Sequence, residues 1–285
     1  MANDRVAQAV ERTLGSVVLS FAGVSGGDIN DAHEARLADG RMIFVKSNRA
    51  APKAMFEAEA RGLAWLADAQ ALRVPKVLAQ GPDFLVLEHL QPGRRSPHHD
   101  EELGRGLAAL HRSGAPGFGL DYDNFIGRLP QANGTCATWA GFYRTRRLEP
   151  QLRMAVDGHL ASATMRHGFE RVLGRLEDLV GPPEPPARLH GDLWAGNAIV
   201  DERGRPCLID PAVFGGHREV DLAMMRLFGG FGARVFSAYE EAFPLAPGHD
   251  ERVPLYQLYF LMVHVNLFGG SYVASVEQAL ARIGA

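Results

Sequence analysis

The segment "LHGDLWAGN", residues 189–197, decides how the rest of this sequence is interpreted. It places one carboxylate, Asp192, directly after a His-Gly pair, and an amide, Asn197, five residues later. A short hairpin is predicted next, with "AIVD" and "PCLID" as strands and "ERGR" as the turn. Because a hairpin reverses the chain, its last residue, Asp210, is expected to lie near the first two polar groups.

Three polar groups in this order suit phosphoryl transfer. A carboxylate beside an acceptor hydroxyl can orient it toward the γ-phosphate of ATP. Mg²⁺ prefers hard oxygen ligands, which an Asn amide and a second carboxylate supply. Protein kinases carry such groups in the same order along the chain. Each residue alone would be explained by a turn, but together they predict Asp192 as the catalytic base and Asn197 and Asp210 as Mg²⁺ ligands.

An unusual lysine supplies a second, independent indication of a kinase-like site. The sequence has only three lysines among thirty basic residues, and Lys46 ends a predicted apolar strand. In the helix expected next, Glu59 shares the apolar face of Phe56, Leu63 and Leu66, where an unpaired carboxylate would be costly. We therefore expect Lys46 and Glu59 to form an ion pair that positions ATP phosphates, as the corresponding pair does in kinases.

Two further segments are candidates for nucleotide contacts by their position. The turn "SGGDIN" contains Gly26 and Gly27, whose backbone N–H groups are expected to cover the ATP phosphates. The turn does not follow the G-x-G-x-x-G pattern or the P-loop pattern. Glu88, His89 and Leu90 fall where a hinge between two lobes would offer backbone groups to adenine.

The predicted elements divide the chain into two unequal lobes. Residues 1–90 are expected to form a β-rich ATP-binding lobe with one helix, and residues 91–285 a larger, mainly helical catalytic and substrate-binding lobe. The fold class is therefore α+β, bilobal, with a catalytic β-hairpin in the helical lobe. Strands are predicted at 16–21, 32–37, 41–46 and 84–90, and helices at 53–70, from Asp100, and near 137–157, 160–180, 219–228, 233–242 and 251–283. Residues 119–135 are predicted to be a loop.

Composition excludes several functional classes. The formal net charge of −3 gives no general basic field for a nucleic-acid partner. The N-terminal residues lack the apolar run of a signal peptide, and the most apolar late segment is interrupted by three polar residues, so no membrane span is expected. Cys136 and Cys207 lie far apart and are expected to be reduced thiols. We therefore expect a cytoplasmic protein.

Longer motifs make the resemblance more specific. The strings "LHGDLWAGN", "IDPAVFGGHREVDLAM", "FEAEARGL" and "DNFIGRLPQ" resemble the fructosamine/ketosamine-3-kinase family, a branch of the aminoglycoside- and choline-kinase group. The similarity runs from about residue 16 almost to the C-terminus. It implies a protein-kinase-like fold and ATP- and Mg²⁺-dependent phosphorylation of the sugar 3-hydroxyl of ketosamines. The family is linked to the reversal of protein glycation.

Other polar residues near these motifs have open roles. Asp221, at the start of a predicted helix, is expected to hold the catalytic-loop backbone. His217 and Arg218 are candidates to face the substrate. Trp194 either stacks on a sugar ring or packs under the loop.

Three alternative functions remain open at this point. One is an aminoglycoside- or choline-type kinase of the same fold, and another is a non-catalytic nucleotide-binding module. The third is a metal hydrolase built on His190, Asp192 and His217, which would leave Lys46 and Glu59 unexplained.

Overall fold

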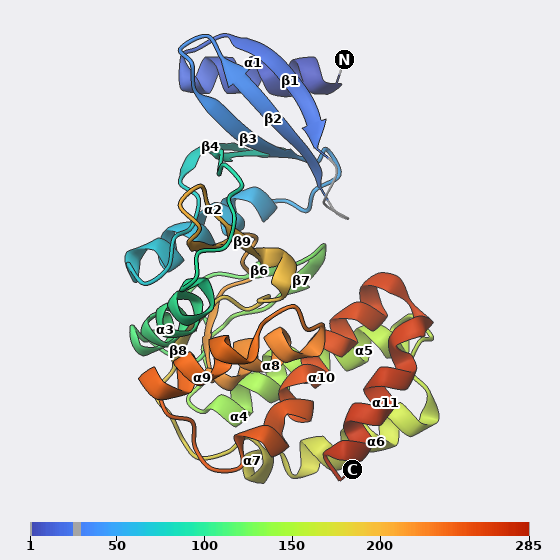
Figure 1. Ribbon diagram of the computed structural model, residues 1–285. Coiled ribbons are helices and arrows are strands. Elements are labelled where there is room, and N and C mark those ends of the chain that lie inside the picture. Colours follow the sequence, from blue (N-terminus) through green and yellow to red (C-terminus); the bar gives the residue numbers. More distant parts are fainter. Residues whose placement is uncertain (1, 25–29, 285) are drawn as a thin grey trace.

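The protein has a small part containing a β-sheet and a larger helical part (Figure 1), as a computed structural model describes for residues 2–24 and 30–284. The two glycines predicted to cover phosphates, Gly26 and Gly27, lie outside the described residues. The small part falls within the first ninety residues, and most of the helices follow it in the chain.

The sheet of the small part has five antiparallel strands. In spatial order they are β1 (Val18–Val24), β2 (Asp31–Leu37), β3 (Met42–Ser47), β5 (Phe84–Glu88) and β4 (Val77–Gly81). Two helices accompany the sheet: α1 (Ala2–Leu14) and α2 (Met55–Asp68).

Alternation along β3 decides what each face of the sheet contacts. Ile43 and Val45 lie in one apolar cluster with Val6 and Val10 of α1. The intervening residues face the other way, so that Phe44 joins the cluster made by α2 and β5. Lys46 follows Phe44 by two positions and therefore emerges on the α2 side of the sheet.

The larger part is built from helices around one extended apolar core. Its helices are α3 (His99–Arg112), α4 (Trp139–Phe142), a π-helical stretch (Tyr143–Leu148), α5 (Glu149–Asp157), α6 (Ala163–Gly174), α7 (Leu176–Leu179), α8 (Glu219–Leu227), α9 (Ala233–Ala242), α10 (His249–Phe268) and α11 (Val273–Arg282), with short 3₁₀ turns at Ala195–Asn197 and Gly270–Tyr272. Helix α10 is apolar on most of its surface, which is typical of a central buried helix. No helix among the described residues is both long enough and apolar enough to cross a membrane.

Three further pairs of short antiparallel strands lie outside the main sheet. They are β6 (Asn124–Ile126) with β7 (Leu129–Gln131), β8 (Ala187–Leu189) with β11 (Phe214–Gly216), and β9 (Ala198–Val200) with β10 (Pro206–Leu208). The β9–β10 pair is the predicted hairpin after residues 189–197, which we call the catalytic loop. The β8–β11 pair joins the residues just before that loop to those just after Asp210.

The structure corrects several sequence predictions. Helix α1 and strand β4 were missed, and the predicted loop 119–135 contains the β6–β7 hairpin. The single helix predicted at 251–283 is two helices, because the chain turns at Gly269, whose φ is +89°. Asp100 lies inside α3 and does not cap it; the helix begins after His98. The three-residue strands β6 and β7 carry too little periodic pattern to be told from a loop in the sequence.

Candidate active site

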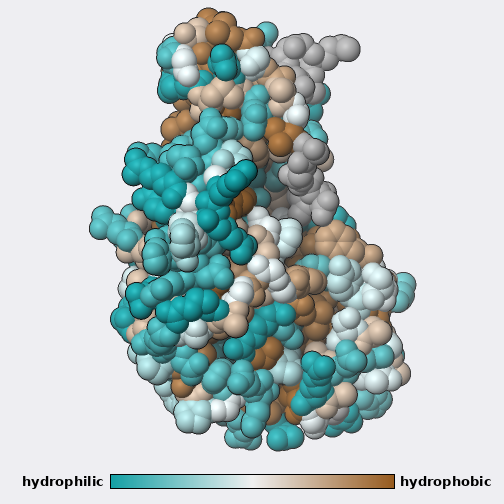
Figure 2. Space-filling model, in the orientation of Figure 1, coloured by the Kyte–Doolittle hydropathy of each residue, from teal (hydrophilic) through white to brown (hydrophobic). Residues whose placement is uncertain are grey.

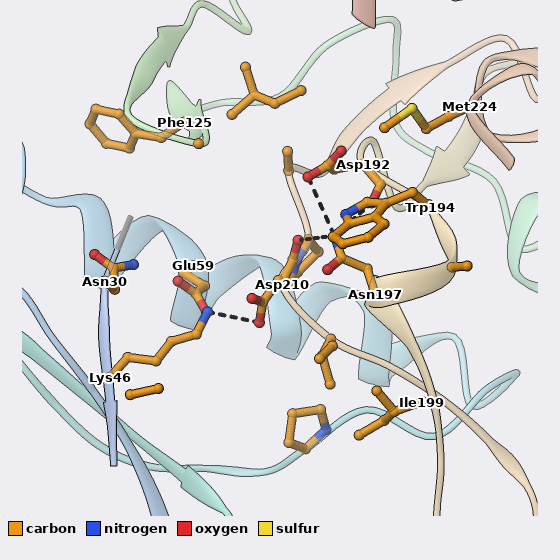
Figure 3. Close-up of a pocket in the computed structure, with 18 of the residues that line it drawn as sticks. Asn30, Lys46, Glu59, Phe125, Asp192, Trp194, Asn197, Ile199, Asp210 and Met224 are labelled. Atoms are coloured by element: carbon orange, nitrogen blue, oxygen red, sulfur yellow. Dashed lines mark hydrogen bonds and ion pairs between the residues drawn. The ribbon is translucent and has the colours of Figure 1, made fainter. Parts of the chain in front are cut away.

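A cavity of about 1090 Å³ lies where the two parts meet, and both parts contribute side chains to it. Lys46 and Glu59 come from the sheet and α2, whereas Asp192, Asn197 and Asp210 come from the catalytic loop and the end of the β9–β10 hairpin. Figure 3 shows these five side chains directed toward one another. The structure therefore brings together the five residues that the sequence predicted to carry the chemistry.

Lys46 connects the sheet to the hairpin end through two ion pairs. Its Nζ lies 2.6 Å from Glu59 Oε1 and 2.8 Å from Asp210 Oδ1 (Figure 3). Burial would lower the pKa of Lys46, but the charges of Asp210 and Glu59 raise it above its ordinary value. Burial also raises the pKa of Glu59, although the Lys46 charge opposes this. The lysine is thus a fixed cation in the cavity, as a phosphate-positioning group requires.

Asn197 holds the catalytic loop together. Its Nδ2 donates to the backbone oxygen of Asp192 at 2.8 Å and approaches the Asp192 carboxylate at 3.4 Å. The same nitrogen lies 3.5 Å from the Asp210 backbone oxygen. These contacts orient the amide so that its oxygen, a suitable metal ligand, is directed away from these backbone oxygens. The spacing of five residues seen in the sequence therefore closes a loop around the Asp192 carboxylate.

The Asp192 carboxylate is tuned toward proton exchange. Burial, together with the nearby charges of Asp210 and Asp221, raises its pKa to about 7, while the hydrogen bond from Asn197 lowers it. A carboxylate with such a pKa can accept a proton and release it near neutral pH.

Asp221, at the start of α8, holds the backbone that precedes Asp192. Its carboxylate accepts hydrogen bonds from the His190 N–H at 2.8 Å and the Gly191 N–H at 2.9 Å, and it contacts His111 Nε2 at 3.1 Å. Burial alone would raise the pKa of Asp221, but hydrogen bonds from His111 and Gly191 lower it. These contacts are those that the predicted supporting role of Asp221 requires.

The glycine of the His-Gly-Asp motif is required by geometry. Gly191 has a φ of +81°, and a Cβ there would lie 2.0 Å from the Ala212 carbonyl oxygen. His190 Nε2 donates to the Ile209 carbonyl oxygen at 2.9 Å, which ties the loop to the end of the hairpin. The catalytic loop and the segment after Asp210 therefore pack backbone against backbone.

Asp210 itself has a φ of +55°, an unfavourable conformation for a residue with a side chain. The residues after it are held by two amides from the β6–β7 hairpin. Asn124 Nδ2 donates to the Val213 oxygen at 2.8 Å, and Gln131 Nε2 donates to the Ala212 oxygen at 3.0 Å. Surrounding contacts of this kind are what maintain a strained backbone at a functional site.

These amides belong to a buried polar network that the sequence did not reveal. Asn133 donates to Asn124 at 2.8 Å, and the Tyr259 hydroxyl donates to Gln131 at 2.5 Å. Arg147 donates to Asn133 at 2.7 Å, and its guanidinium lies 3.9 Å from the centre of the Phe214 ring. The only available signal was the density of Asn and Gln residues within a largely apolar segment, "DNFIGRLPQAN".

The predicted hinge lines the cavity through Glu88, His89 and Leu90. The Glu88 N–H already donates to the Lys76 backbone oxygen at 2.8 Å, so this N–H is not available to hydrogen-bond adenine. The Glu88 carboxylate binds Arg73 at 2.8 Å. Arg73 also binds Asp201, at 2.7 Å, in the turn of the β9–β10 hairpin. Arg73 therefore fastens the hinge to the hairpin, a role that the sequence did not indicate.

Two of the predicted substrate contacts lie elsewhere. His217 is 2% exposed and stacks on Tyr256 with ring centres 5.4 Å apart, and Arg218 forms a paired salt bridge with Glu184 at 2.8 Å. Neither residue lines the cavity, so their predicted contact with substrate is not supported. Their packing against the segment near residue 184 is a long-range contact, which sequence proximity to Asp210 does not reveal.

Trp194, in contrast, does line the cavity and is 42% exposed. Its ring also covers Gly196, where a Cβ would lie 2.2 Å from the indole. Both roles weighed for Trp194 therefore have a structural basis.

The metal-hydrolase alternative lacks its ligand cluster. His190 uses its ring nitrogens on the Asp192 N–H and the Ile209 oxygen, and His217 lies away from both. Among the described residues, no three His, Cys, Asp or Glu side chains are grouped so that they could hold a metal ion. Mg²⁺ does not need such a cage, because it commonly takes one or two protein ligands and completes its shell with phosphates and water. The Asp210 carboxylate and the Asn197 amide fit that requirement.

Comparison with known proteins agrees with this geometry. The chain matches the fructosamine kinase family over residues 2–285. A probable ketoamine kinase of Synechocystis sp. is 39% identical over 286 aligned residues, which cover 96% of this chain and 94% of the relative. The chain belongs to the fructosamine kinase family. Another relative, the chloroplastic protein-ribulosamine 3-kinase of Arabidopsis thaliana, is 36% identical, with 92% of this chain and 82% of the relative covered.

Solved structures show that the fold also follows the fructosamine kinase family. A structure assigned as a fructosamine-3-kinase from Thermobifida fusca superimposes with a TM-score of 0.92 at 39% identity, covering 98% of both chains. A macrolide 2'-phosphotransferase from Brachybacterium faecium, at 17% identity and a TM-score of 0.64, shares the fold alone. This fructosamine kinase family member is therefore a phosphotransferase with the α+β, protein-kinase-like fold that the sequence predicted.

Proposed function

We propose that this fructosamine kinase family member transfers the γ-phosphate of ATP to the sugar 3-hydroxyl of ketosamines, the ketose adducts of amines. The observation that supports this best is the convergence of the Lys46–Glu59–Asp210 ion pairs with Asp192 and Asn197 in one cavity. A non-catalytic nucleotide-binding module would not need an acceptor-orienting carboxylate beside the phosphate-positioning groups.

The two parts of the chain divide the work in this proposal. Residues 1–90 form the ATP-binding lobe and residues 91–285 the catalytic and substrate-binding lobe. Lys46, held by Glu59, contacts the α- and β-phosphates, and the hinge at 88–90 receives adenine. Asn197 and Asp210 would hold Mg²⁺, which would neutralise charge on the phosphates when bound.

Asp192 performs the proton chemistry. Its carboxylate accepts a hydrogen bond from the 3-hydroxyl and orients the oxygen in line with the γ-phosphorus. As the new oxygen–phosphorus bond forms and the bond to the β-phosphate oxygen breaks, the hydroxyl proton passes to Asp192 and ADP leaves. A pKa near 7 lets Asp192 release this proton to solvent before the next turnover.

An ADP-release assay tests the proposal. The protein is supplied with ATP and Mg²⁺ and with synthetic ribulosamines and fructosamines, and choline and an aminoglycoside serve as competing acceptors. Selective turnover of the ketosamines supports the proposal, and phosphorylation confined to choline or the aminoglycoside contradicts it. Metal dependence is tested by adding a chelator, which is expected to abolish turnover. We also propose a cytoplasmic setting for the reaction.

The variant Asp192→Asn separates the catalytic role from nucleotide binding. We expect nearly unchanged affinity for ATP with Mg²⁺ by calorimetry, and a severe loss of single-turnover transfer to a ribulosamine. Recovery of full transfer at saturating nucleotide would instead identify Asp192 as a nucleotide or metal ligand.

A further inference from the structure

Part of the cavity surface is aromatic and unused by the proposed chemistry. Phe228, His264, Phe268 and Tyr272 line the cavity at the ends of α8, α10 and the following 3₁₀ turn. We call these four residues the aromatic wall. The His264 ring lies 4.8 Å from Phe228, 5.5 Å from Phe268 and 5.0 Å from Tyr272, measured between ring centres.

The aromatic wall leaves large ring surfaces open. Phe228 is 44% exposed and Phe268 is 48% exposed, which makes them two of the most exposed large apolar residues among those that the structure describes. Figure 2 shows apolar surface in the helical part close to its junction with the sheet. Exposed phenylalanines beside a substrate cavity indicate a surface that a ligand covers.

The aromatic wall lies on the acceptor side of Asp192. Asp221, Met224 and Phe228 follow one another at helical spacing on one side of α8. Asp221 holds the catalytic-loop backbone, and Met224 lies beside Asp192 in Figure 3. Phe228 is therefore about one helical turn, roughly 6 Å along the helix axis, from Met224. In a ketosamine the amine nitrogen is on C1, four bonds from the reacting C3 oxygen, so the amine remains close to Asp192 when the 3-hydroxyl is bound there.

The charges in the cavity favour a cationic acceptor. The described lining residues include five carboxylates, at Glu34, Glu59, Glu88, Asp192 and Asp210, of which Glu88 is paired with Arg73 outside the lining. Lys46 is the single Lys or Arg among those lining residues, and it is committed to Glu59 and Asp210. ATP adds further negative charge. An acceptor with an anionic group near the aromatic wall would find no described cation there, whereas an ammonium is attracted by the whole cavity.

His264 is held within the aromatic wall by its backbone contact. Its Nδ1 donates to the Phe260 carbonyl oxygen at 2.8 Å, and burial lowers its pKa below the ordinary value. Burial therefore favours the uncharged form of this ring.

We propose that the aromatic wall binds the substituted ammonium group of the ketosamine acceptor through cation–π contacts, and so selects amine adducts over neutral ketose derivatives. The proposal rests on the function proposed above and adds to it the site that recognises the amine. Contacts of this kind are strongest for a cation over the face of an aromatic ring and are lost with an aliphatic side chain of similar size.

The test compares a ribulosamine with its thioether analogue, in which sulfur replaces the amine nitrogen and the charge is absent. Affinity is measured by calorimetry in the presence of a non-hydrolysable ATP analogue and Mg²⁺, and kcat/KM is measured with ATP. The wild-type protein is expected to prefer the amine in both measurements. In Phe228→Leu and in Phe268→Leu this preference should fall about threefold to tenfold, the range expected for an exposed to partly desolvated cation–π contact.

A matched control uses Leu267, an aliphatic residue in the same lining. Leu267→Ala removes apolar area but no ring, so it is expected to weaken the amine and the thioether equally. Phe228→Trp, which keeps a ring, should retain the preference for the amine.

The outcomes separate the two proposals. If Phe228→Leu and Phe268→Leu weaken both ligands equally, or if the wild-type protein binds both equally, the aromatic wall does not recognise the ammonium, whatever the turnover. If the amine is bound selectively through these rings but no phosphate is transferred, the proposed reaction is wrong and the recognition site stands. If neither compound binds, both proposals fall.

Discussion

Replacing Asp221 by Asn tests whether the catalytic loop depends on one buried carboxylate. The side chain is inaccessible to solvent, and both of its oxygens accept hydrogen bonds. One oxygen receives the His190 N–H and contacts His111, and the other receives the Gly191 N–H. An amide keeps only one oxygen, so its NH₂ group must face one of these donors. The variant therefore loses the charge and at least one hydrogen bond, and it leaves a buried N–H without an acceptor.

The magnitude follows from these contacts. A hydrogen bond to a charged group contributes about 1.5–3 kcal/mol, and an unsatisfied buried donor costs a further amount of about 1–3 kcal/mol. We expect Asp221→Asn to lower the free energy of unfolding by about 3–5 kcal/mol, the range measured when one member of a buried charge pair is removed. Because domains are stable by about 5–15 kcal/mol, the variant should still fold at room temperature.

Urea unfolding, followed by circular dichroism, measures this loss. Asp250→Asn is the matched control, because Asp250 is exposed and pairs with Arg226 at 2.8 Å on the surface. We expect the control to change the free energy of unfolding by less than about 1 kcal/mol. A similarly small effect in Asp221→Asn would refute the claim that this carboxylate holds the loop.

The pH dependence supplies a second readout. The pKa of Asp221 is lowered in the folded protein, so its stabilising contribution is complete above the unfolded pKa of about 3.9 and is lost as pH falls through the folded value. The difference in stability between the wild-type protein and Asp221→Asn should therefore narrow as the pH falls below about pH 4. A difference that stayed constant down to pH 3 would contradict the assigned role of the charge.

Three further variants test the rest of the site. Lys46→Ala should lower kcat by a factor of about 10²–10³, with a smaller effect on ATP affinity. Glu59→Ala should show a milder form of the same defect, and both variants are measured by steady-state kinetics. A wild-type kcat in both variants would mean that the ion pair has no role in catalysis. Asp210→Ala should remove Mg²⁺-dependent turnover while the thermal unfolding midpoint stays within a few degrees of wild type; activity at ordinary Mg²⁺ concentration would defeat its assignment as a ligand. Gln131→Leu leaves the Ala212 carbonyl oxygen and the Tyr259 hydroxyl without their hydrogen-bond partner. We expect it to lower the free energy of unfolding, measured by urea denaturation, by about 2–4 kcal/mol. An effect below about 1 kcal/mol would mean that the amide network does not hold the segment after Asp210.

The central groups of the site were predictable because local geometry controls them. Alternation along a strand and a three-to-four residue spacing along a helix were enough to direct Lys46 and Glu59 to the same side of the sheet. The separation of Asp192 and Asn197 fits one closed loop, and a short hairpin returns Asp210 to it. In each case the residues are close in sequence or lie on elements that are neighbours in the chain.

The supporting contacts were not predictable, because they join segments that are far apart in sequence. The partner of Asp221, His111, lies 110 residues earlier in the chain, and Gln131 reaches a carbonyl oxygen 81 residues later. His217 and Arg218 are close to Asp210 in sequence, yet packing directs them to the opposite side, toward Tyr256 and Glu184. No local pattern contains such information.

The sequence by itself therefore determined the fold class, the order of the polar groups along the chain and the pairing of Lys46 with Glu59, which we propose to position phosphates. Periodicity and turn chemistry act over a few residues, and these features depend on nothing longer. Only the tertiary structure decided which polar residues are scaffold and which face the cavity, because burial is a property of the packed chain. It also assembled the aromatic wall from α8, α10 and the turn after α10, whose residues acquire a common surface only when the helices pack together.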